Sequence, residues 1–295
     1  MARPPSIPGW SIERRWRTTD YADHFIATRP SAGGEAPERA FLRVLRPMLG
    51  TEPEAILRHG REVRLLAGFR HEGVLPVVAS GLTESGDPWL ATEWRDGRLL
   101  RAVLDAGPVR WRDAVRIATR VAEVLGAAHD VGYVHRDLRP AHVLVGRDGH
   151  VWVLDFDQVH HDDGLGDITD LNRRVGSVPY MSPEYIERHH LDARSDLYAL
   201  GVLLYELATG TLPFQGTDAE VCIAHVTQPV PDHPRLDTTP GGFRDLVRRL
   251  LAKNPDDRPG SATSAAAELR AVGRIPRRAN SLPPGTTSPL ASLGG

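Results

Sequence analysis

The alternation of apolar and polar residues divides the chain into two regions of different character. Between residue 10 and about 95, short β-rich segments are separated by the polar stretches SAGGEAPE and ESGDP, and these segments are FIAT, AFLRVL, VLPVVASGL and PWLATEW. Between the second and third segments, Ile56, Val63, Leu65 and Leu66 have the spacing of one helix face. We therefore expect a small sheet with one helix in this region.

From about residue 100 the apolar spacing becomes helical, and the segments concerned are WRDAVRIATRVAEVLGAAHDVG, SDLYALGVLLYELATG, GFRDLVRRLLAK and SATSAAAELRAVG. Short strands are expected at HVLV and VWVLDF, with the turn GRDGH between them. After Gly273 the residues are mainly Pro, Ser and Gly with little to bury, which predicts a disordered tail or linker over 274–295. The expected organisation is an N-terminal extension (1–9), a β-rich region (10–95), a mainly helical region (96–273) and this tail.

Composition restricts the classes of function. The chain has 295 residues, of which 41% are hydrophobic, so it is long enough to fold around a sizeable core. Its net charge of −2 gives no basic field for nucleic acid, and we expect no nucleic-acid partner. The single cysteine, the start MARPPSIPGW and the lack of an apolar run of roughly 18 residues predict a cytoplasmic protein without a membrane segment.

Several short motifs carry chemistry. His135-Arg136-Asp137 lies in VHRDLRPAHVLV, Asp155-Phe156-Asp157 follows VWVL, Ser182-Pro183-Glu184 lies in GSVPYMSPE, Asp196 and Gly201 lie in SDLYALG, and Arg258 follows. In order and spacing they resemble the HRD, DFG and APE motifs of eukaryotic-like protein kinases, especially bacterial Ser/Thr kinases, over roughly residues 10–273. The resemblance implies an α+β, bilobal protein-kinase fold, with a small β-rich N-lobe that has one helix and a larger, mainly helical C-lobe.

The resemblance also implies a role for each motif residue. Asp137 would orient the substrate hydroxyl, and Asp155 would hold Mg²⁺ against the phosphates of ATP. His135, Arg136, Phe156 and Asp196 would be structural, and Glu184 and Arg258 would form a buried pair. Thr92 would be the gatekeeper, Glu93 would lie in the hinge, and Leu144 would lie under the adenine, although ordinary strand packing explains these three equally well. Thr169 and Ser177 are candidate phosphorylation sites, with Arg136 as the cation for a loop phosphate.

The chain departs from the kinase pattern where ATP would bind. Arg43 stands in place of the lysine that holds the α and β phosphates and pairs with the helix glutamate, here Glu62, and an arginine does not reproduce the compact ammonium. Phe41 replaces the alanine that roofs the adenine, and its ring would fill the slot. Two alternatives remain: the strand is shifted so that Arg46 is the lysine counterpart, or Phe41 simply packs in the sheet. The expected glycine-rich loop, in RTTDYADHFIAT, contains no glycine.

The catalytic loop departs as well. His142 replaces the asparagine that would hold the second Mg²⁺, and an imidazole prefers softer ions than Mg²⁺. A histidine that is merely hydrogen-bonded in the loop is the simpler interpretation, with no metal role. Arg139 replaces the usual lysine, so it is vestigial or atypical, and Asp157 replaces the DFG glycine.

Three functions follow from this pattern. The leading interpretation is a pseudokinase, a regulatory or binding module that needs no cofactor and acts through protein partners of unknown identity. The alternative is an active, atypical protein Ser/Thr kinase that uses ATP and Mg²⁺, with Arg43 and Arg139 doing the work of lysines. A small-molecule phosphotransferase fits less well, because such enzymes generally lack the APE-type segment and the SDLYALG helix.

Overall fold

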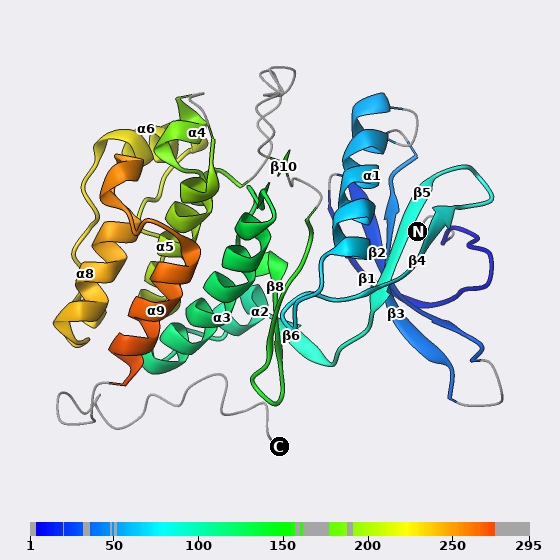
Figure 1. Ribbon diagram of the computed structural model, residues 1–295, viewed down its shortest axis with the longest axis horizontal. Helices are drawn as coiled ribbons and strands as arrows, with labels where there is room; N and C mark the ends of the chain where they lie inside the picture. Colours follow the sequence, from blue (N-terminus) through cyan, green and yellow to red (C-terminus); the bar gives the residue numbers. More distant parts are fainter. Residues whose placement is uncertain are drawn as a thin grey trace. The chain divides into compact units, whose positions relative to one another are not determined.

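The computed structural model contains two compact units, residues 1–96 (unit 1) and 97–295 (unit 2), each considered by itself (Figure 1). It describes residues 4–19, 21–31, 36–47, 49, 52–156, 160–161, 177–187 and 191–274. Asp157, Thr169 and the tail from residue 275, about which the sequence makes predictions, lie outside this described part.

Unit 1 is built on a five-stranded antiparallel sheet with the order β1-β2-β3-β5-β4 (Figure 1). Its strands are β1 (Ser11–Thr18), β2 (Ala22–Arg29), β3 (Glu38–Leu45), β4 (Val77–Leu82) and β5 (Pro88–Glu93). The helix α1 (Pro53–Gly68) joins β3 to β4 and contacts β4 and β5. The small sheet with one helix that the alternation predicts is therefore present.

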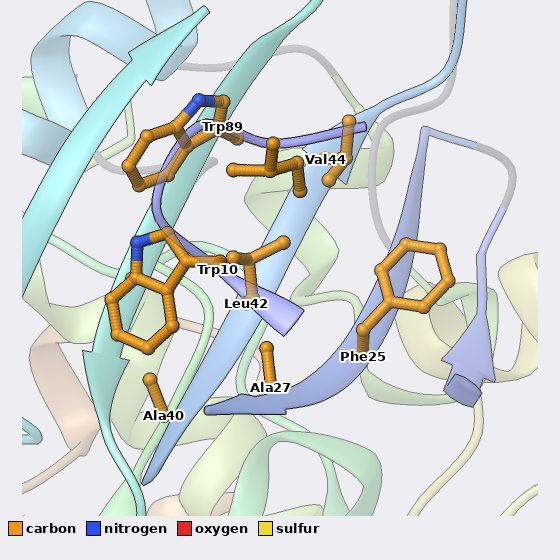
Figure 2. Packing of buried hydrophobic residues seen from close by; sticks show 9 residues of the cluster. Trp10, Phe25, Ala27, Ala40, Leu42, Val44 and Trp89 are labelled. Atoms are coloured by element: carbon orange, nitrogen blue, oxygen red, sulfur yellow. The ribbon is translucent and has the colours of Figure 1, made fainter. Parts of the chain in front are cut away.

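The core of unit 1 lies on one face of this sheet. Figure 2 shows Phe25 and Ala27 from β2, Ala40, Leu42 and Val44 from β3, and Trp89 from β5 packed together with Trp10. Ile7 and Trp10 belong to a short N-terminal segment that pairs with itself through an isolated bridge and supplies two members of this cluster. The residues before β1 thus help to bury the apolar face of the sheet.

One expected helix position differs from the structure. Leu65 and Leu66 of α1 are buried, but Ile56 is 42% exposed and its neighbour Leu57 is 57% exposed. The first turns of α1 turn Ala55, Arg58 and His59 inward instead. The buried face of α1 therefore includes the polar side chains of Arg58 and His59 as well as apolar residues.

Unit 2 is mainly helical, as expected. Its α-helices are α2 (Leu100–Leu104), α3 (Trp111–Asp130), α4 (Pro183–Ile186), α5 (Ala193–Thr209), α6 (Asp218–Thr227), α7 (Pro234–Asp237), α8 (Gly241–Leu250) and α9 (Ala262–Gly273). Short 3₁₀ turns are η1 (Pro140–His142), η3 (Val178–Tyr180) and η4 (Pro255–Asp257). The strands are β6 (Gly97–Leu99), β8 (Val143–Gly146) and β9 (Val151–Val153) in one sheet, and β7 (Tyr133–Val134) with β10 (His160–His161) in another.

The helix α5 is the centre of unit 2, with α3, α8 and α9 against it. Every residue from Ser195 to Thr209 is buried, and the two carboxylates among them, Asp196 and Glu206, have hydrogen-bond partners. Asp192 caps its first turn by accepting from the backbone N–H of Arg194, and Gly210, with a φ of 84°, ends it in the left-handed conformation. In the described part of the chain, no helix is both long and apolar enough to cross a membrane.

Candidate functional site

The loop that follows β7 is held in place by Asp196 of α5. The Asp196 carboxylate accepts the backbone N–H groups of His135 (2.8 Å) and Arg136 (2.9 Å) and lies 2.8 Å from His129 Nε2. Burial raises the pKa of Asp196, but the hydrogen bonds and charges of His129 and His135 together lower it more, so its pKa is below the ordinary value. A buried carboxylate with these partners holds the backbone just before Asp137 in place.

His135 connects this loop to the segment after β9. Its ring is fully buried, with Nε2 3.1 Å from the Leu154 carbonyl and the ring centroid 4.8 Å from that of Phe156. Because a carbonyl only accepts, Nε2 carries the hydrogen, and Nδ1 accepts from the backbone N–H of Asp137 at 3.3 Å. The structural role that the resemblance implies for His135 and Phe156 therefore has a physical basis.

Two residues next to the chemistry have strained backbones. Arg136 has a φ of 65° and Asp155 a φ of 56°, and these are the positive values among the non-glycine residues that the structure describes. Left-handed conformations of this kind cost about 1–3 kcal/mol and persist only where the surroundings impose them. The surroundings of unit 2 impose them on the arginine of one motif and on the aspartate of the other.

The four polar side chains singled out by the two motifs meet in unit 2. His142, which is buried in η1, has Nδ1 3.3 Å from Asp137 Oδ2 and Nε2 3.3 Å from Asp155 Oδ2. Its Nδ1 also lies 2.8 Å from the main-chain oxygen of Asp137. Arg139 Nε lies 3.3 Å from His142 Nε2 and 3.6 Å from Asp137 Oδ2. The imidazole therefore bridges both carboxylates, with a guanidinium beside it.

This arrangement fits Mg²⁺ poorly. Mg²⁺ demands near-octahedral oxygen ligands, whereas the residue beside Asp155 is an imidazole and the next neighbour is a cation, Arg139. In the part of the chain that the structure describes, no group of three or more His, Cys, Asp or Glu side chains could hold a metal ion. The oxygen-rich ligand set that the resemblance implies for Mg²⁺ is not provided by these side chains.

In unit 1, Arg43 forms the ion pair with Glu62 that the sequence predicts. Arg43 Nη2 donates to Glu62 Oε2, and both side chains are buried, while Arg46 lies beyond the end of β3 and is exposed. This contact is the one that the resemblance implies for the lysine counterpart, and the role of Arg43 toward phosphates stays a prediction. His59 Nδ1 lies 3.4 Å from Arg43 Nη2, and burial together with the charge of Arg43 lowers its pKa to about 4. A neutral His59 thus stands beside the pair.

Phe41 is part of a row of aromatic rings. Its ring centroid lies 4.6 Å from that of Trp16, with a 34° tilt, and 6.4 Å from that of Trp94. Arg17 lies 5.2 Å from the centre of the Trp16 ring, and Arg39 lies 4.6 Å from the centre of the Trp94 ring. Phe41 therefore packs with two tryptophans, and each tryptophan ring is covered by a guanidinium group.

Trp16 and His59 are contributors that the sequence pattern did not reveal. Trp16 lies in β1, where register shifts occur between Ile12 and Arg14 and between Arg15 and Arg17. A bulge changes which face a residue occupies, so simple alternation does not indicate that Trp16 reaches Phe41. His59 could have been found from its position three residues before Glu62 on the same helix.

The remaining nucleotide-site residues lie on strands. Thr92 is the cross-strand partner of Phe41 in β5, and Glu93, the last residue of β5, pairs with Arg95 at 2.7 Å. Leu144 is buried in β8 opposite Leu99 and Trp152. All three take part in the strand packing that is the simpler interpretation, and their contact with a nucleotide stays a prediction.

The expected buried pair of Glu184 and Arg258 is present. Arg258 Nη1 and Nη2 donate to the two oxygens of Glu184 at 2.7 and 2.8 Å, and Ser195 Oγ donates to the same carboxylate at 2.8 Å. Burial raises the pKa of Glu184, but the hydrogen bonds and charge of Arg258 outweigh it, so the pKa is below the ordinary value. The pair fixes α4 to the segment that follows α8 and to the start of α5.

Next to this pair, unit 2 has a hollow lined by Arg136, Asp137, Ser177, Tyr180, Ser182 and Tyr185, among others. Tyr180 donates to Glu206 at 2.5 Å, and Arg101 donates to the other oxygen of Glu206 at 2.6 Å. Burial and the charge of Glu206 raise the pKa of Tyr180, so its hydroxyl remains protonated. Asp137 and Ser177 therefore line the same hollow.

Comparison with known proteins agrees with this architecture. The protein kinase domain family matches residues 51–269. Serine/threonine-protein kinase pkn3 of Myxococcus xanthus is 38% identical over 256 residues, covering 82% of this chain and 46% of the relative. Serine/threonine-protein kinase PknB of Mycolicibacterium smegmatis is 35% identical over 237 residues, covering 77% and 38%. Serine/threonine-protein kinase PknA of Mycobacterium tuberculosis is 32% identical over 266 residues, covering 87% and 61%.

The chain spans less than half the length of the first two of these relatives. The matched region includes α1, the loop around Asp137, the Asp155 segment and the Glu184–Arg258 pair. The expected mixed α+β kinase fold is thereby confirmed. The chain belongs to the protein kinase domain family and is homologous to bacterial serine/threonine kinases.

Proposed function

We propose that this protein is a pseudokinase: a kinase domain that serves as a binding or regulatory module for protein partners and does not transfer phosphate. The observation that carries the proposal is the stacking of Phe41, at the family's adenine-roof position, on Trp16 at 4.6 Å. A phenyl ring there has far more volume than the methyl group of alanine, and closely packed sites tolerate added volume poorly.

The row of rings also resists rearrangement. An aromatic pair contributes about 0.5–1.5 kcal/mol beyond its buried area, and an exposed cation–π contact about 0.5–1 kcal/mol. Arg39, which covers Trp94, is itself held by Glu13 at 2.5 Å. If moving Phe41 aside costs about 2 kcal/mol, the apparent affinity for a nucleotide falls roughly thirtyfold.

The region in which the phosphates of ATP would bind supports the same conclusion. The turn between β1 and β2 is closed by the backbone hydrogen bond from Thr19 to Ala22 at 2.9 Å, and no glycine is present to let phosphates approach the backbone. The fork of Arg43 is engaged with Glu62, and the rigid, planar group does not reproduce a lysine ammonium. Several independent contributions to ATP binding would have to be restored together.

Thermal unfolding with and without millimolar ATP tests the proposal. We expect no shift for the unmodified protein and a gain for Phe41→Ala, because the smaller side chain opens the adenine position. A ligand at about 100 times its dissociation constant stabilises by about 2.7 kcal/mol, a shift of roughly 5–10 °C for a domain of this size.

The matched control is Phe69→Ala, which removes a half-buried phenyl ring at the end of α1, away from the row of rings. This variant should gain no response to ATP, so a general loosening of unit 1 can be told apart from opening of the slot. A clear shift in the unmodified protein would show that Phe41 does not close the site, and the proposal would be withdrawn.

The retained Arg43–Glu62 pair favours one alternative, an active but atypical Ser/Thr protein kinase. The relatives pkn3 and PknB are named serine/threonine-protein kinases. The two proposals differ in phosphoryl transfer: an active kinase moves labelled γ-phosphate to protein hydroxyls in a reaction that Asp137→Asn abolishes. Transfer of this kind by the unmodified protein would establish the alternative.

A further inference from the structure

Lys253 is the only lysine in the chain, and it lies in the segment that follows α8. Its side chain reaches aromatic rings: Nζ lies 4.5 Å from the centre of the Phe214 ring and 5.8 Å from that of Tyr198. Nζ also donates to the Ala224 carbonyl at 3.3 Å and to the Tyr198 hydroxyl at 3.5 Å. The amine therefore contacts both α5 and α6, and the residue is half-buried.

The groups around this amine supply positive charge and no ion-pair partner. The guanidinium of Arg258 is close enough to repel a second cation. Among the residues that the structure describes, no carboxylate forms an ion pair with Lys253. Glu184, which is close to Tyr198, has both of its oxygens bonded by Arg258. The remaining titratable neighbour is His225, whose pKa is lowered by burial and by the charge of Lys253. The amine thus lacks the negative partner that would hold it in its charged form.

These surroundings favour the neutral form of the amine. Burial, and after it the charge of Arg258, lower the pKa of Lys253 to about 8. A lysine becomes a nucleophile in a protein when it is desolvated among apolar side chains or lies next to another cation. Lys253 meets both conditions, because it lies against the Phe214 ring and beside Arg258.

We propose that Lys253 is a modification site for small activated acyl groups, which it takes from acyl phosphates or acyl thioesters. The neutral amine attacks the carbonyl carbon, so a C–N bond forms and the bond from that carbon to the phosphate oxygen or the thiol sulfur breaks. One proton passes from the nitrogen to the leaving group, and the product is an amide with no change of oxidation state. A short acyl chain such as acetyl suits a half-buried amine better than a long one.

Acylation changes the charge at this point of unit 2. The amide is neutral, so position 253 no longer repels Arg258 and no longer adds to the effect of burial on the pKa of His225. His225 Nε2 donates to the Pro179 carbonyl at 3.1 Å, and Tyr180, the next residue in η3, lines the hollow described above. The modification therefore alters the charge beside a histidine that is bonded to η3.

This inference goes beyond the proposed function and does not depend on it, because every atom involved lies in unit 2 and no nucleotide takes part. Its test contains no ATP. A reactive lysine can therefore exist in a protein that binds no nucleotide, and failure of either proposal leaves the other standing.

The experiment treats the full chain with acetyl phosphate or, in a separate reaction, with the thioester S-acetyl-N-acetylcysteamine, and measures acetylation of Lys253 by peptide mapping. At pH 7 an amine with a pKa of about 8 is neutral in roughly one molecule in ten, against roughly one in three thousand for an ordinary lysine. The less basic amine is also a weaker nucleophile, a loss on the order of tenfold if amines behave as thiols do. Lys253 should therefore react on the order of tenfold faster in the folded chain than in guanidinium chloride. The donor that reacts faster identifies the source of the acyl group.

The matched control is Arg70→Lys, which places a second lysine at an exposed position after α1, so that two amines are compared in one folded chain. At pH 7 the lysine introduced at position 70 should react on the order of tenfold more slowly than Lys253. As the pH is raised, the rate at Lys253 should level off above about pH 8, whereas the rate at position 70 should continue to rise. Equal rates at the two positions, or a rate at Lys253 that rises without levelling off, would overturn the inference.

Discussion

Replacing Arg258 by alanine should be among the most destabilising single changes in unit 2. The Arg258 side chain is completely buried and bonds both oxygens of Glu184. It also donates to the main-chain oxygens of Arg194, Ala252 and Lys253, at 2.8, 2.9 and 3.1 Å. One side chain therefore satisfies a buried carboxylate and three carbonyls from two segments, the start of α5 and the residues that follow α8.

The expected loss follows from these contacts. Stranding the charge of Glu184 costs about 3–5 kcal/mol, and each carbonyl that remains dry without its donor adds about 1 kcal/mol. A domain is typically stable by only 5–15 kcal/mol, so Arg258→Ala should lose a large part of the stability of unit 2. The double change Glu184→Gln with Arg258→Met removes both charges and should recover part of this loss.

Urea unfolding at neutral pH measures the effect, and a loss of 3 kcal/mol corresponds to a midpoint about 6–12 °C lower in a thermal scan. The control is Arg270→Ala, whose ion pair with Glu123 is at the surface and should contribute about 1 kcal/mol or less. The lowered pKa of Glu184 means that its pairing stabilises the fold above the ordinary carboxyl pKa and is lost as pH falls through the folded value. Equal losses for Arg258→Ala and Arg270→Ala would refute the reasoning.

Two further predictions concern packing and pH. Gly201→Ala should destabilise unit 2 by about 1–3 kcal/mol in urea unfolding, because a new Cβ would lie 2.8 Å from Leu250 Cβ. Gly60→Ala should instead stabilise α1 by about 0.5–1 kcal/mol, because nothing lies within 4 Å of a new Cβ there. A gain in stability at both sites would contradict the close approach of α5 and α8. Burial, reinforced by a nearby lysine, lowers the pKa of His225 to about 4. The stability that the neutral histidine contributes should therefore be complete above pH 6.5 and fall by about 3 kcal/mol as pH drops from 6.5 to about 4. His225→Gln should reduce this pH dependence when unfolding is measured across the range, and an unchanged pH dependence would show that other groups cause it.

The catalytic loop shows what sequence motifs can predict and what they cannot. Their order and spacing were sufficient to predict the fold, because together they resemble the pattern of a family whose fold is known. The partners of His142 could not be predicted in this way. Asp155 is brought to its imidazole by the pairing of β8 with β9, and the protonated nitrogen depends on a main-chain oxygen.

Unit 1 shows the same division. The alternation of residues was enough to predict strands around Phe41 and a helix around Glu62, since the period of apolar positions reflects local geometry. It left open whether Arg43 or Arg46 is the lysine counterpart, and only the packing of α1 against the sheet places a carboxylate beside Arg43.

The sequence by itself therefore determined the fold class, the family resemblance and the positions at which the kinase pattern fails. Tertiary structure alone decided what replaces the missing features: Trp16 reaches Phe41 because bulges in β1 change the face on which its residues lie. Local residue preferences fix helices and strands, but side chains far apart in the chain meet only through strand register and helix packing, which no short stretch of sequence encodes.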